Sequence, residues 1–240
     1  MVKTINLISG PRNVSTALMY SFAERPDTRV IDEPLYGHYL RLTHAPQPHW
    51  DELIHLLETD GEKAVRESIL TLPPDCDVYF IKNMAHHLIE LDDAWLSEVE
   101  NVFLIRDPEQ MLPSLINQIA EPIGRDVALE AQANWFDRVR AEGKDPVVLD
   151  SKELLLDPEK ILQELCERIG INFDPGMLSW EAGPREEDGP WAKYWYQNLH
   201  KSTGFAPYCE KTDPFPERLV PLLEETRPFY EKLYAEALKA

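Results

Sequence analysis

The chain of 240 residues carries 43 acidic and 24 basic side chains, which gives a formal net charge of −19. A surface this acidic disfavours nucleic acid and anionic membranes as partners, because both are recognised by basic residues. The hydrophobic content of 43% suits one domain with a full core, and no apolar stretch approaches the ~18 residues of a membrane span.

The N-terminal residues 1–4 lead directly into an apolar run, without the charged and apolar regions of a signal peptide. The three cysteines, Cys76, Cys166 and Cys209, are odd in number and widely spaced, which is typical of reduced thiols. We therefore expect a cytoplasmic protein in which residues 1–240 form a single domain.

Five short apolar runs are bounded by turn signals, at residues 4–8, 29–31, 78–81, 102–105 and 147–149. Continuous apolar runs of this length are typical of strands buried on both faces, as in a parallel sheet. Helical patterns lie between them. Apolar residues recur over 14–22, 111–119 and 161–169, and residues 216–238 are expected to form a closing helix.

Capping signals support two of these helices. Asp107 and Pro108 open one, and the pair Asp157 and Pro158 opens another that ends at Gly170. Strands alternating with helices predict an α/β fold with a parallel sheet, in which ligands bind beyond the carboxyl ends of the strands.

The stretch SGPRNVST, residues 9–16, stands at the carboxyl end of the first predicted strand. A glycine turn before a helix exposes backbone N–H groups, and Arg12 with two hydroxyls adds further donors. These features favour a phosphate site. The nucleotide-triphosphatase motif is absent, since Ser15 and Thr16 occupy its second glycine and lysine positions.

A second polar motif, RDPEQMLPS, covers residues 106–114. Arg106 ends a predicted strand and Ser114 lies early in the following helix, so both can contact one phosphate. The alternative is a local ion pair between Arg106 and Asp107.

Together the two motifs resemble the sulfotransferase family, with P-[KR]-x-x-[ST]-[ST] after the first strand and R-x7-S after a later one. Residues 146–180 resemble the family's strand, its E-x-L-x-x-D-P turn and its helix ending in glycine. The resemblance implies a P-loop-like α/β fold in three layers, with about five parallel strands between helices. It also implies metal-free sulfuryl transfer from 3′-phosphoadenosine 5′-phosphosulfate, with residues 180–240 covering the acceptor and the nucleotide.

By position, the resemblance assigns the 5′-phosphosulfate to Arg12 and to residues Asn13, Val14, Ser15 and Thr16, and the 3′-phosphate to Arg106 and Ser114. The chain departs from the family at Ala17, where a tryptophan often lies under the adenine. The family's late R-K-G stretch is replaced by HKSTGF, which offers Lys201, Ser202, Thr203 and Gly204 as further nucleotide-binding candidates.

Two segments compete to supply the general base. Glu33 follows the second predicted strand, and several sulfotransferase branches use a glutamate; the alternatives are that Asp32 caps a helix and Glu33 binds an arginine. Lys82 matches the lysine of the family's K-x-H motif, but Met84 stands at the histidine position. His86 and His87 follow closely and are the alternative bases.

The acceptor is not readable from the sequence. Residues 36–70 and 180–210 supply aromatic side chains that suit either a pocket wall or core closure: Tyr36, Tyr39, Trp50, Trp191, Trp195 and Phe205. The remaining histidines lack metal-ligand spacing, so no metal is expected. We predict a small-molecule acceptor and leave the oligomeric state open, with a homodimer as one alternative. The competing functions are a P-loop kinase or NTP hydrolase and a non-catalytic nucleotide-binding protein.

Overall fold

The computed structural model describes residues 2–45 and 49–240. Five parallel strands form one sheet in the order β2-β3-β1-β4-β5. Their bounds are β1 Lys3–Ser9, β2 Thr28–Asp32, β3 Val78–Met84, β4 Glu100–Ile105 and β5 Val147–Asp150. Each contains one of the predicted apolar runs, so the predicted α/β fold with a five-stranded parallel sheet is confirmed.

The α-helices are α1 Ser15–Ala23, α2 Tyr36–Thr43, α3 Trp50–Leu53, α4 Gly61–Ala64, α5 Pro108–Leu115, α6 Gly124–Val127, α7 Leu129–Ala141, α8 Ser151–Leu156, α9 Pro158–Ile169, α10 Ala192–Trp195 and α11 Val220–Tyr234. Shorter helical turns are η1 Ile54–Leu56, η2 Val65–Ile69, η3 Ala85–His87, η4 Ala94–Glu98, η5 Pro175–Leu178, η6 Leu199–Lys201 and η7 Glu217–Leu219.

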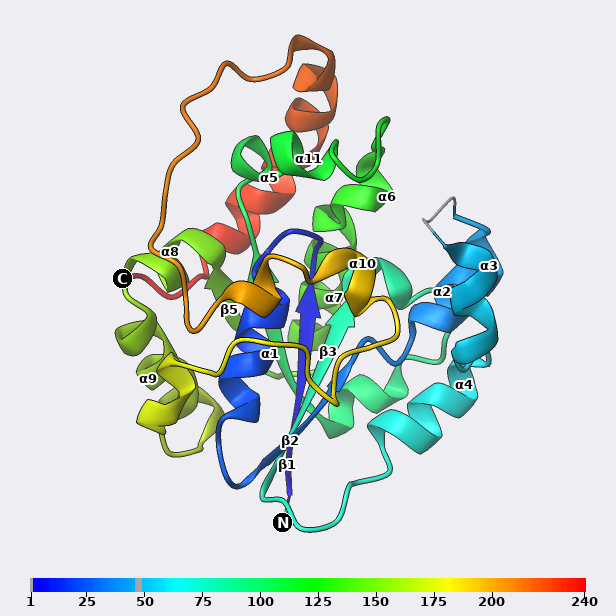
Figure 1. Cartoon of the computed structure of the whole chain (residues 1–240), viewed down its shortest axis with the longest axis vertical. Coiled ribbons are helices and arrows are strands. Elements are labelled where there is room, and N and C mark those ends of the chain that lie inside the picture. Colours follow the sequence, from blue (N-terminus) through cyan, green and yellow to red (C-terminus); the bar gives the residue numbers. More distant parts are fainter. Residues whose placement is uncertain (1, 46–48) are drawn as a thin grey trace.

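Helices cover both faces of the sheet and create two separate apolar cores. On one face, Leu18 and Phe22 of α1 pack with Leu165 of α9 against the strands. On the other face, Phe136 of α7 and Leu223 of α11 pack in a second cluster. Figure 1 shows α1 in front of the sheet and α9 beside it. The result is the predicted three-layer arrangement.

Three buried asparagines connect the central strands. Asn83 of β3 donates to Asn6 of β1, and Asn6 donates to Asn101 of β4, each at 2.9 Å. Asn101 in turn donates to the carbonyl oxygen of Leu96 at 2.8 Å. All three amides are at most 2% exposed, so their hydrogen bonds across the strands fix the relative positions of β3, β1 and β4.

The predicted helix caps are present. Asp107 accepts a hydrogen bond from the backbone N–H of Glu109, and Asp157 accepts one from that of Lys160. Gly170 ends α9 with φ of 73°, a left-handed conformation that favours glycine.

Two helices end earlier than the periodicity predicts. The predicted helix over 111–119 stops at Leu115 and continues as turns, in which Gln118 and Ile119 donate to the Leu115 carbonyl. The closing helix, expected to reach residue 238, ends at Tyr234. Its apolar end instead extends the sheet, since Leu238 donates a backbone hydrogen bond of 3.0 Å to Val148 of β5.

A long irregular segment, residues 180–210, passes over the carboxyl ends of the strands together with α10 (Figure 1). Trp191 and Tyr196 from this segment pack against Tyr36 and Tyr39 of α2 in a third apolar cluster. The segment therefore covers the edge of the sheet where a ligand is expected to bind.

Candidate functional site

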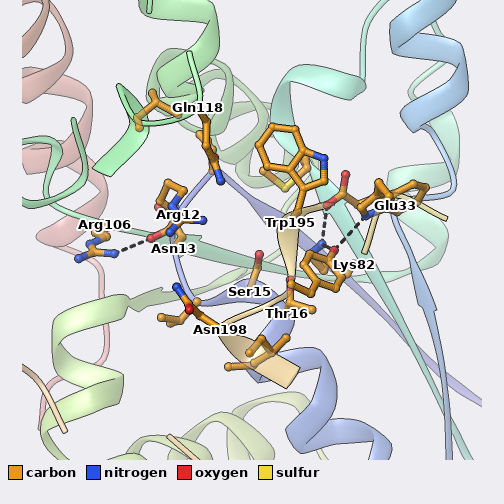
Figure 2. A pocket seen from close by; sticks show the side chains of 18 of the residues that line it. Arg12, Asn13, Ser15, Thr16, Glu33, Lys82, Arg106, Gln118, Trp195 and Asn198 are labelled. Carbon is orange, nitrogen blue, oxygen red and sulfur yellow. Dashed lines mark hydrogen bonds and ion pairs between the residues drawn. The ribbon is translucent and has the colours of Figure 1, made fainter. Parts of the chain in front are cut away.

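A cavity of about 570 Å³ lies at the carboxyl edge of the sheet. Its walls come from the loop after β1, the ends of β2 and β3, Arg106 after β4, and the covering segment 180–210. Figure 2 shows Arg12 and Arg106 at one end of this cavity and Glu33, Lys82 and Trp195 at the other. We call these the arginine end and the carboxylate end.

The loop between β1 and α1 has an unusual backbone. Arg12 and Val14 adopt left-handed conformations, with φ of 60° and 59°. Gly10 allows this turn, because a Cβ at that position would lie 3.1 Å from the Asn13 amide and from the Val127 carbonyl oxygen. Helix α1 begins without a side-chain cap from Val14, which leaves its first N–H groups uncapped, and Ser15 and Thr16 of this first turn line the cavity.

Asn13 stabilises this loop from within. Its buried side chain donates to the Leu104 carbonyl at 2.9 Å, and its own carbonyl accepts from Ser151 at 2.9 Å. The predicted donor residues Arg12, Val14, Ser15 and Thr16 all line the cavity, as does Ala17. Asn13 lines it too, but its amide is already bonded to β4.

The two sequence motifs interlock at the arginine end. Arg12 Nε donates to Ser114 Oγ at 2.9 Å, and Arg106 donates to the Arg12 carbonyl oxygen at 2.6 Å. Within the described residues neither arginine forms an ion pair with a carboxylate, so the local pair with Asp107 is not seen. Burial lowers the pKa of Arg12. The pKa of Arg106 is lowered mainly by burial and then by the positive charge of Arg12.

A third cation, Lys211, lies near the two arginines and was missed by sequence reasoning. Burial lowers its pKa first, and the charges of Arg106 and Arg12 lower it further. Its backbone N–H donates to Gln110 of α5 at 2.9 Å, which fixes the loop after segment 180–210. Lys211 follows an irregular stretch of about 30 residues, so no local pattern marks its position.

The predicted residues of segment 200–205 divide into two groups. Ser202 and Gly204 line the cavity, whereas the side chains of Lys201 and Thr203 are exposed to solvent. Ser202 Oγ is held by Trp180, whose indole N–H donates to it at 3.0 Å.

At the carboxylate end, Lys82 is almost fully buried and its ammonium has three partners. It donates to Asp32 at 2.7 Å, to Glu33 at 2.5 Å and to the Tyr196 hydroxyl at 2.9 Å. Asp32 and Lys82 are direct partners in the pairing of β2 with β3, which places their side chains on the same face. Glu33 therefore binds a lysine instead of an arginine, and Asp32 does not cap α2.

Tyr196 connects the covering segment to this ion cluster. Its hydroxyl donates to Asp32 at 2.8 Å and accepts from the Trp191 indole at 3.1 Å. Burial alone lowers the pKa of Lys82, but the charges of Asp32 and Glu33 raise it well above its usual value. Burial and the charge of Asp32 raise the pKa of Tyr196, so the lysine stays charged and the phenol neutral at neutral pH.

Glu33 has a distinctive position in this cluster. Its φ of 41° turns the chain immediately after β2, and its Oε1 accepts from Lys82. Its Oε2 accepts no hydrogen bond from the described residues; the nearest cationic candidate is His87 Nδ1 at 3.9 Å. The Glu33 side chain is 13% exposed and lines the cavity, so one carboxylate oxygen is available to a bound molecule.

His86 and His87, the alternative bases, both line the cavity from η3. Burial is the main reason why the pKa of each histidine lies well below its usual value. The second cause is the interaction with His87 in the case of His86, and the charge of Lys82 in the case of His87. His87 stacks on Tyr36 and Tyr39, at ring distances of 5.1 and 4.7 Å. Both histidines are therefore neutral at neutral pH.

Aromatic side chains complete the carboxylate end. Of the predicted aromatics, those that line the cavity are Tyr36, Tyr39, Trp191, Trp195 and Phe205; Trp50 packs against the third apolar cluster instead. Tyr194 and Tyr196 were not predicted and line it as well. Residues 46–48 of the predicted acceptor segment lie outside the described residues.

Within residues 2–45 and 49–240, no helix is long and apolar enough to cross a membrane. The same ranges hold no group of three or more His, Cys, Asp or Glu side chains placed to bind a metal ion.

Comparisons with known proteins indicate the family of the chain. A family model described as a sulfotransferase domain matches residues 2–237. The chain also resembles two proteins of Arabidopsis thaliana, branched-chain-amino-acid aminotransferase-like proteins 2 and 1. The first is 39% identical over 233 residues and the second 37% identical over 231. These matches cover 97% and 96% of this chain, but the chain spans only 41% of the length of each relative.

Two solved structures share the fold. A sulfotransferase from Alicyclobacillus acidocaldarius superposes with a TM-score of 0.55 at 12% identity, covering 99% of this chain and 98% of that one. The sulfotransferase domain from the curacin biosynthetic pathway gives 0.54 at 16% identity, covering 99% of both chains. Since a sulfotransferase model matches nearly every residue and the fold agrees, the chain belongs to the sulfotransferase domain family.

Proposed function

We propose that the protein transfers a sulfuryl group from 3′-phosphoadenosine 5′-phosphosulfate to a hydroxyl or amine of a small acceptor. The observation that carries this proposal is the asymmetry of one cavity. Its arginine end holds cations that no described carboxylate neutralises, and its carboxylate end presents a free oxygen of Glu33. Such a cavity suits an anionic donor at one end and a proton-losing acceptor at the other.

The donor is assigned to the arginine end. Arg12 and the first N–H groups of α1 bind the 5′-phosphosulfate, with the hydroxyls of Ser15 and Thr16 beside them. Arg106, with Ser114 and the nearby charge of Lys211, binds the 3′-phosphate. The crossed hydrogen bonds between Arg12, Arg106 and Ser114 support this assignment, because they fix the two phosphate sites relative to each other.

The transfer step requires a base and a fixed cation. A lone pair of the acceptor oxygen forms a bond to sulfur, while the bond from sulfur to the 5′-phosphate oxygen breaks. Glu33 takes the acceptor proton, and the products are a sulfate ester and adenosine 3′,5′-bisphosphate. Arg12 neutralises the charge that grows on the leaving phosphate oxygen.

Lys82 is a positioning residue in this mechanism. An ammonium group has three N–H donors, and all three of its partners are protein groups here. The ion pair holds Glu33 by its Oε1 and leaves Oε2 without a hydrogen bond from the described residues. His86 and His87, buried and neutral, are the less favoured bases.

The alternative functions have weaker support. A P-loop kinase needs the glycine and lysine whose positions hold Ser15 and Thr16. The names of the two plant relatives suggest aminotransferase activity, but this chain aligns with only 41% of each of them, and it matches a sulfotransferase family model itself. The buried lysine of the cavity is held as an ammonium by two carboxylates, whereas Schiff-base chemistry needs a neutral amine. A non-catalytic nucleotide-binding protein would keep the arginine end without turnover.

Thermal unfolding of the full chain tests the donor. Adenosine 3′,5′-bisphosphate at one hundred times its Kd should stabilise the protein by about 2.7 kcal/mol, and ATP with Mg²⁺ should give no comparable shift. Stabilisation by ATP with Mg²⁺ alone would overturn the proposal. Release of adenosine 3′,5′-bisphosphate from the phosphosulfate donor in the presence of an acceptor then separates an enzyme from a non-catalytic binding protein.

A further inference from the structure

The carboxylate end of the cavity carries an excess of negative charge. Lys82 is shared by Asp32 and Glu33, so the three buried or half-buried groups together carry one more negative charge than positive. A second carboxylate, Asp126, lines the same cavity, and its only hydrogen bond within the described residues comes from the Ile123 N–H at 3.0 Å. His86 and His87 add no positive charge, because they are buried and each leaves its Nδ1 without a hydrogen bond in the described structure.

One cation reduces this excess without removing it. Arg125 lies close enough to influence Tyr39 and His86, but its side chain is exposed and it does not line the cavity. Among the described residues, Glu33 and Asp126 line the cavity, whereas Arg125 does not, and Lys193 over the Tyr194 ring is already paired with Glu52. The end of the cavity assigned to the acceptor therefore has a negative electrostatic potential. Low-dielectric walls around the charges strengthen this potential inside the cavity.

One aromatic ring in the wall of this end, that of Trp195, has free faces. Trp195 lines the cavity, and in the described part of the chain no aromatic ring or cation stacks on it. Its indole N–H has no protein acceptor there either. Figure 2 shows its ring at the same end of the cavity as Glu33 and Lys82. Tyr194 and Trp191 line this end beside it.

A net negative charge beside an unoccupied indole face is a combination that binds organic ammonium groups. The ring face attracts the cation through its quadrupole, and the carboxylate supplies the opposite charge. A neutral or anionic acceptor would use the apolar rings but gain nothing from Glu33 and Asp126. It would also leave the net negative charge of this end without an added cation, which is unfavourable when the acceptor displaces water.

We propose that the acceptor is a small alcohol or phenol that carries an ammonium group, and that this group binds against the Trp195 ring, in the negative field of Glu33 and Asp126. The inference rests on the proposed sulfuryl transfer, since it names the acceptor of that same site. In this arrangement the hydroxyl of the acceptor lies toward Glu33 Oε2 and the donor, and the ammonium group of the acceptor lies against Trp195.

Binding calorimetry on the full chain saturated with adenosine 3′,5′-bisphosphate tests the inference without requiring turnover. Choline is compared with 3,3-dimethyl-1-butanol, its uncharged carbon isostere, and tyramine with 4-propylphenol. We expect at least one ammonium compound to bind about tenfold more tightly than its neutral partner. Equal affinity within both pairs, or no binding by any of the four compounds, would overturn the inference.

Variants locate the ammonium site. Trp195→Leu should weaken the preferred ammonium compound about tenfold, Trp195→Phe should weaken it less, and both should keep the affinity for adenosine 3′,5′-bisphosphate. Asp126→Asn should also reduce the preference for the charged member of the pair. If Trp195→Leu weakens the neutral isostere as much as the ammonium compound, the ring is only an apolar wall and the inference fails.

The outcome is separable from that of the proposed function. Tight binding of adenosine 3′,5′-bisphosphate, with sulfuryl transfer to uncharged alcohols at the same rate as to their ammonium analogues, would overturn the acceptor class and keep the transferase. Loss of bisphosphate binding itself would overturn the transferase first.

Discussion

Arg106 donates a hydrogen bond of 2.6 Å to the backbone carbonyl oxygen of Arg12, across 94 positions of the sequence. The accepting residue is left-handed, with φ of 60°. The bond therefore holds the strained loop after β1 with a side chain from the end of β4. The same guanidinium is left with donors for an anion.

Arg106→Ala should weaken binding of adenosine 3′,5′-bisphosphate by about ten- to one-hundredfold, because a charge-assisted contact of about 1.5–3 kcal/mol is lost. Adenosine 5′-phosphosulfate, which lacks the 3′-phosphate, should lose much less. Isothermal titration of both ligands measures the difference, and Arg66→Ala, an exposed arginine far from the cavity, is the control. Equal losses for both ligands would remove Arg106 from the 3′-phosphate site.

Lys211 and Lys201 form a matched pair for the nucleotide site. Lys211→Ala should weaken adenosine 3′,5′-bisphosphate about three- to tenfold at low salt, and less at high salt, because its charge acts beside Arg12 and Arg106. Lys201→Ala should change the affinity by less than about twofold, since this side chain is exposed outside the cavity lining. A larger loss of affinity in Lys201→Ala than in Lys211→Ala would instead support the sequence-based assignment of Lys201 to the nucleotide site.

Glu33→Gln should preserve nucleotide affinity and lower turnover by about 10²- to 10⁴-fold, because the amide cannot accept the acceptor proton. His87→Gln should cost far less activity, since the pKa of His87 is well below its usual value and its Nδ1 lies 3.9 Å from Glu33. Initial rates on the same acceptor compare the variants, with melting temperatures to confirm folding. A larger loss in His87→Gln would transfer the base to the histidine.

Tyr196→Phe should lower the free energy of unfolding by about 1–3 kcal/mol, because buried Lys82, Asp32 and Trp191 all lose a partner. Tyr194→Phe is the matched control. Its hydroxyl bonds Glu52 at the surface, and its loss should cost less than about 0.5 kcal/mol. Urea denaturation measures both, and similar values for the two variants would contradict the role of Tyr196.

Asp150 gives a pH-dependent prediction. Burial raises its pKa from 3.8 to about 6, despite N–H bonds from Lys152 and Glu153. The folded state therefore binds a proton more tightly than the unfolded state, so this contribution to stability is full below about pH 4 and lost as the pH rises through 6. In the wild-type protein this lowers the free energy of unfolding by up to about 3 kcal/mol as the pH rises, and Asp150→Asn, which keeps the acceptor oxygen, should abolish that decline. Urea denaturation of the wild-type protein and of Asp150→Asn at pH 4.5 and 7 tests this prediction. The same change in the free energy of unfolding between the two pH values in both proteins would contradict it.

The sequence predicts the sheet well because buried parallel strands leave continuous apolar runs, and the caps at Asp107 and Asp157 are local signals. It also marks Arg106 and Glu33, which directly follow strands, and Arg12, which lies three residues after one. It could not reveal Tyr196 or Lys211, whose roles depend on how an irregular segment folds back over the sheet. The partners of Glu33 were equally hidden, because Lys82 reaches it through the pairing of β2 with β3.

The chain of amides from Asn83 through Asn6 to Asn101 has a consequence for how this site can change. A one-residue slip of β1 would bury these amides without partners, so the offset between the three central strands is fixed far from the ligand. The loops that follow those strands inherit that offset: Arg12 after β1, His86 after β3 and Arg106 after β4. Substitutions can therefore accumulate in the loops and alter what is bound, while the spacing between the two ends of the cavity stays constant.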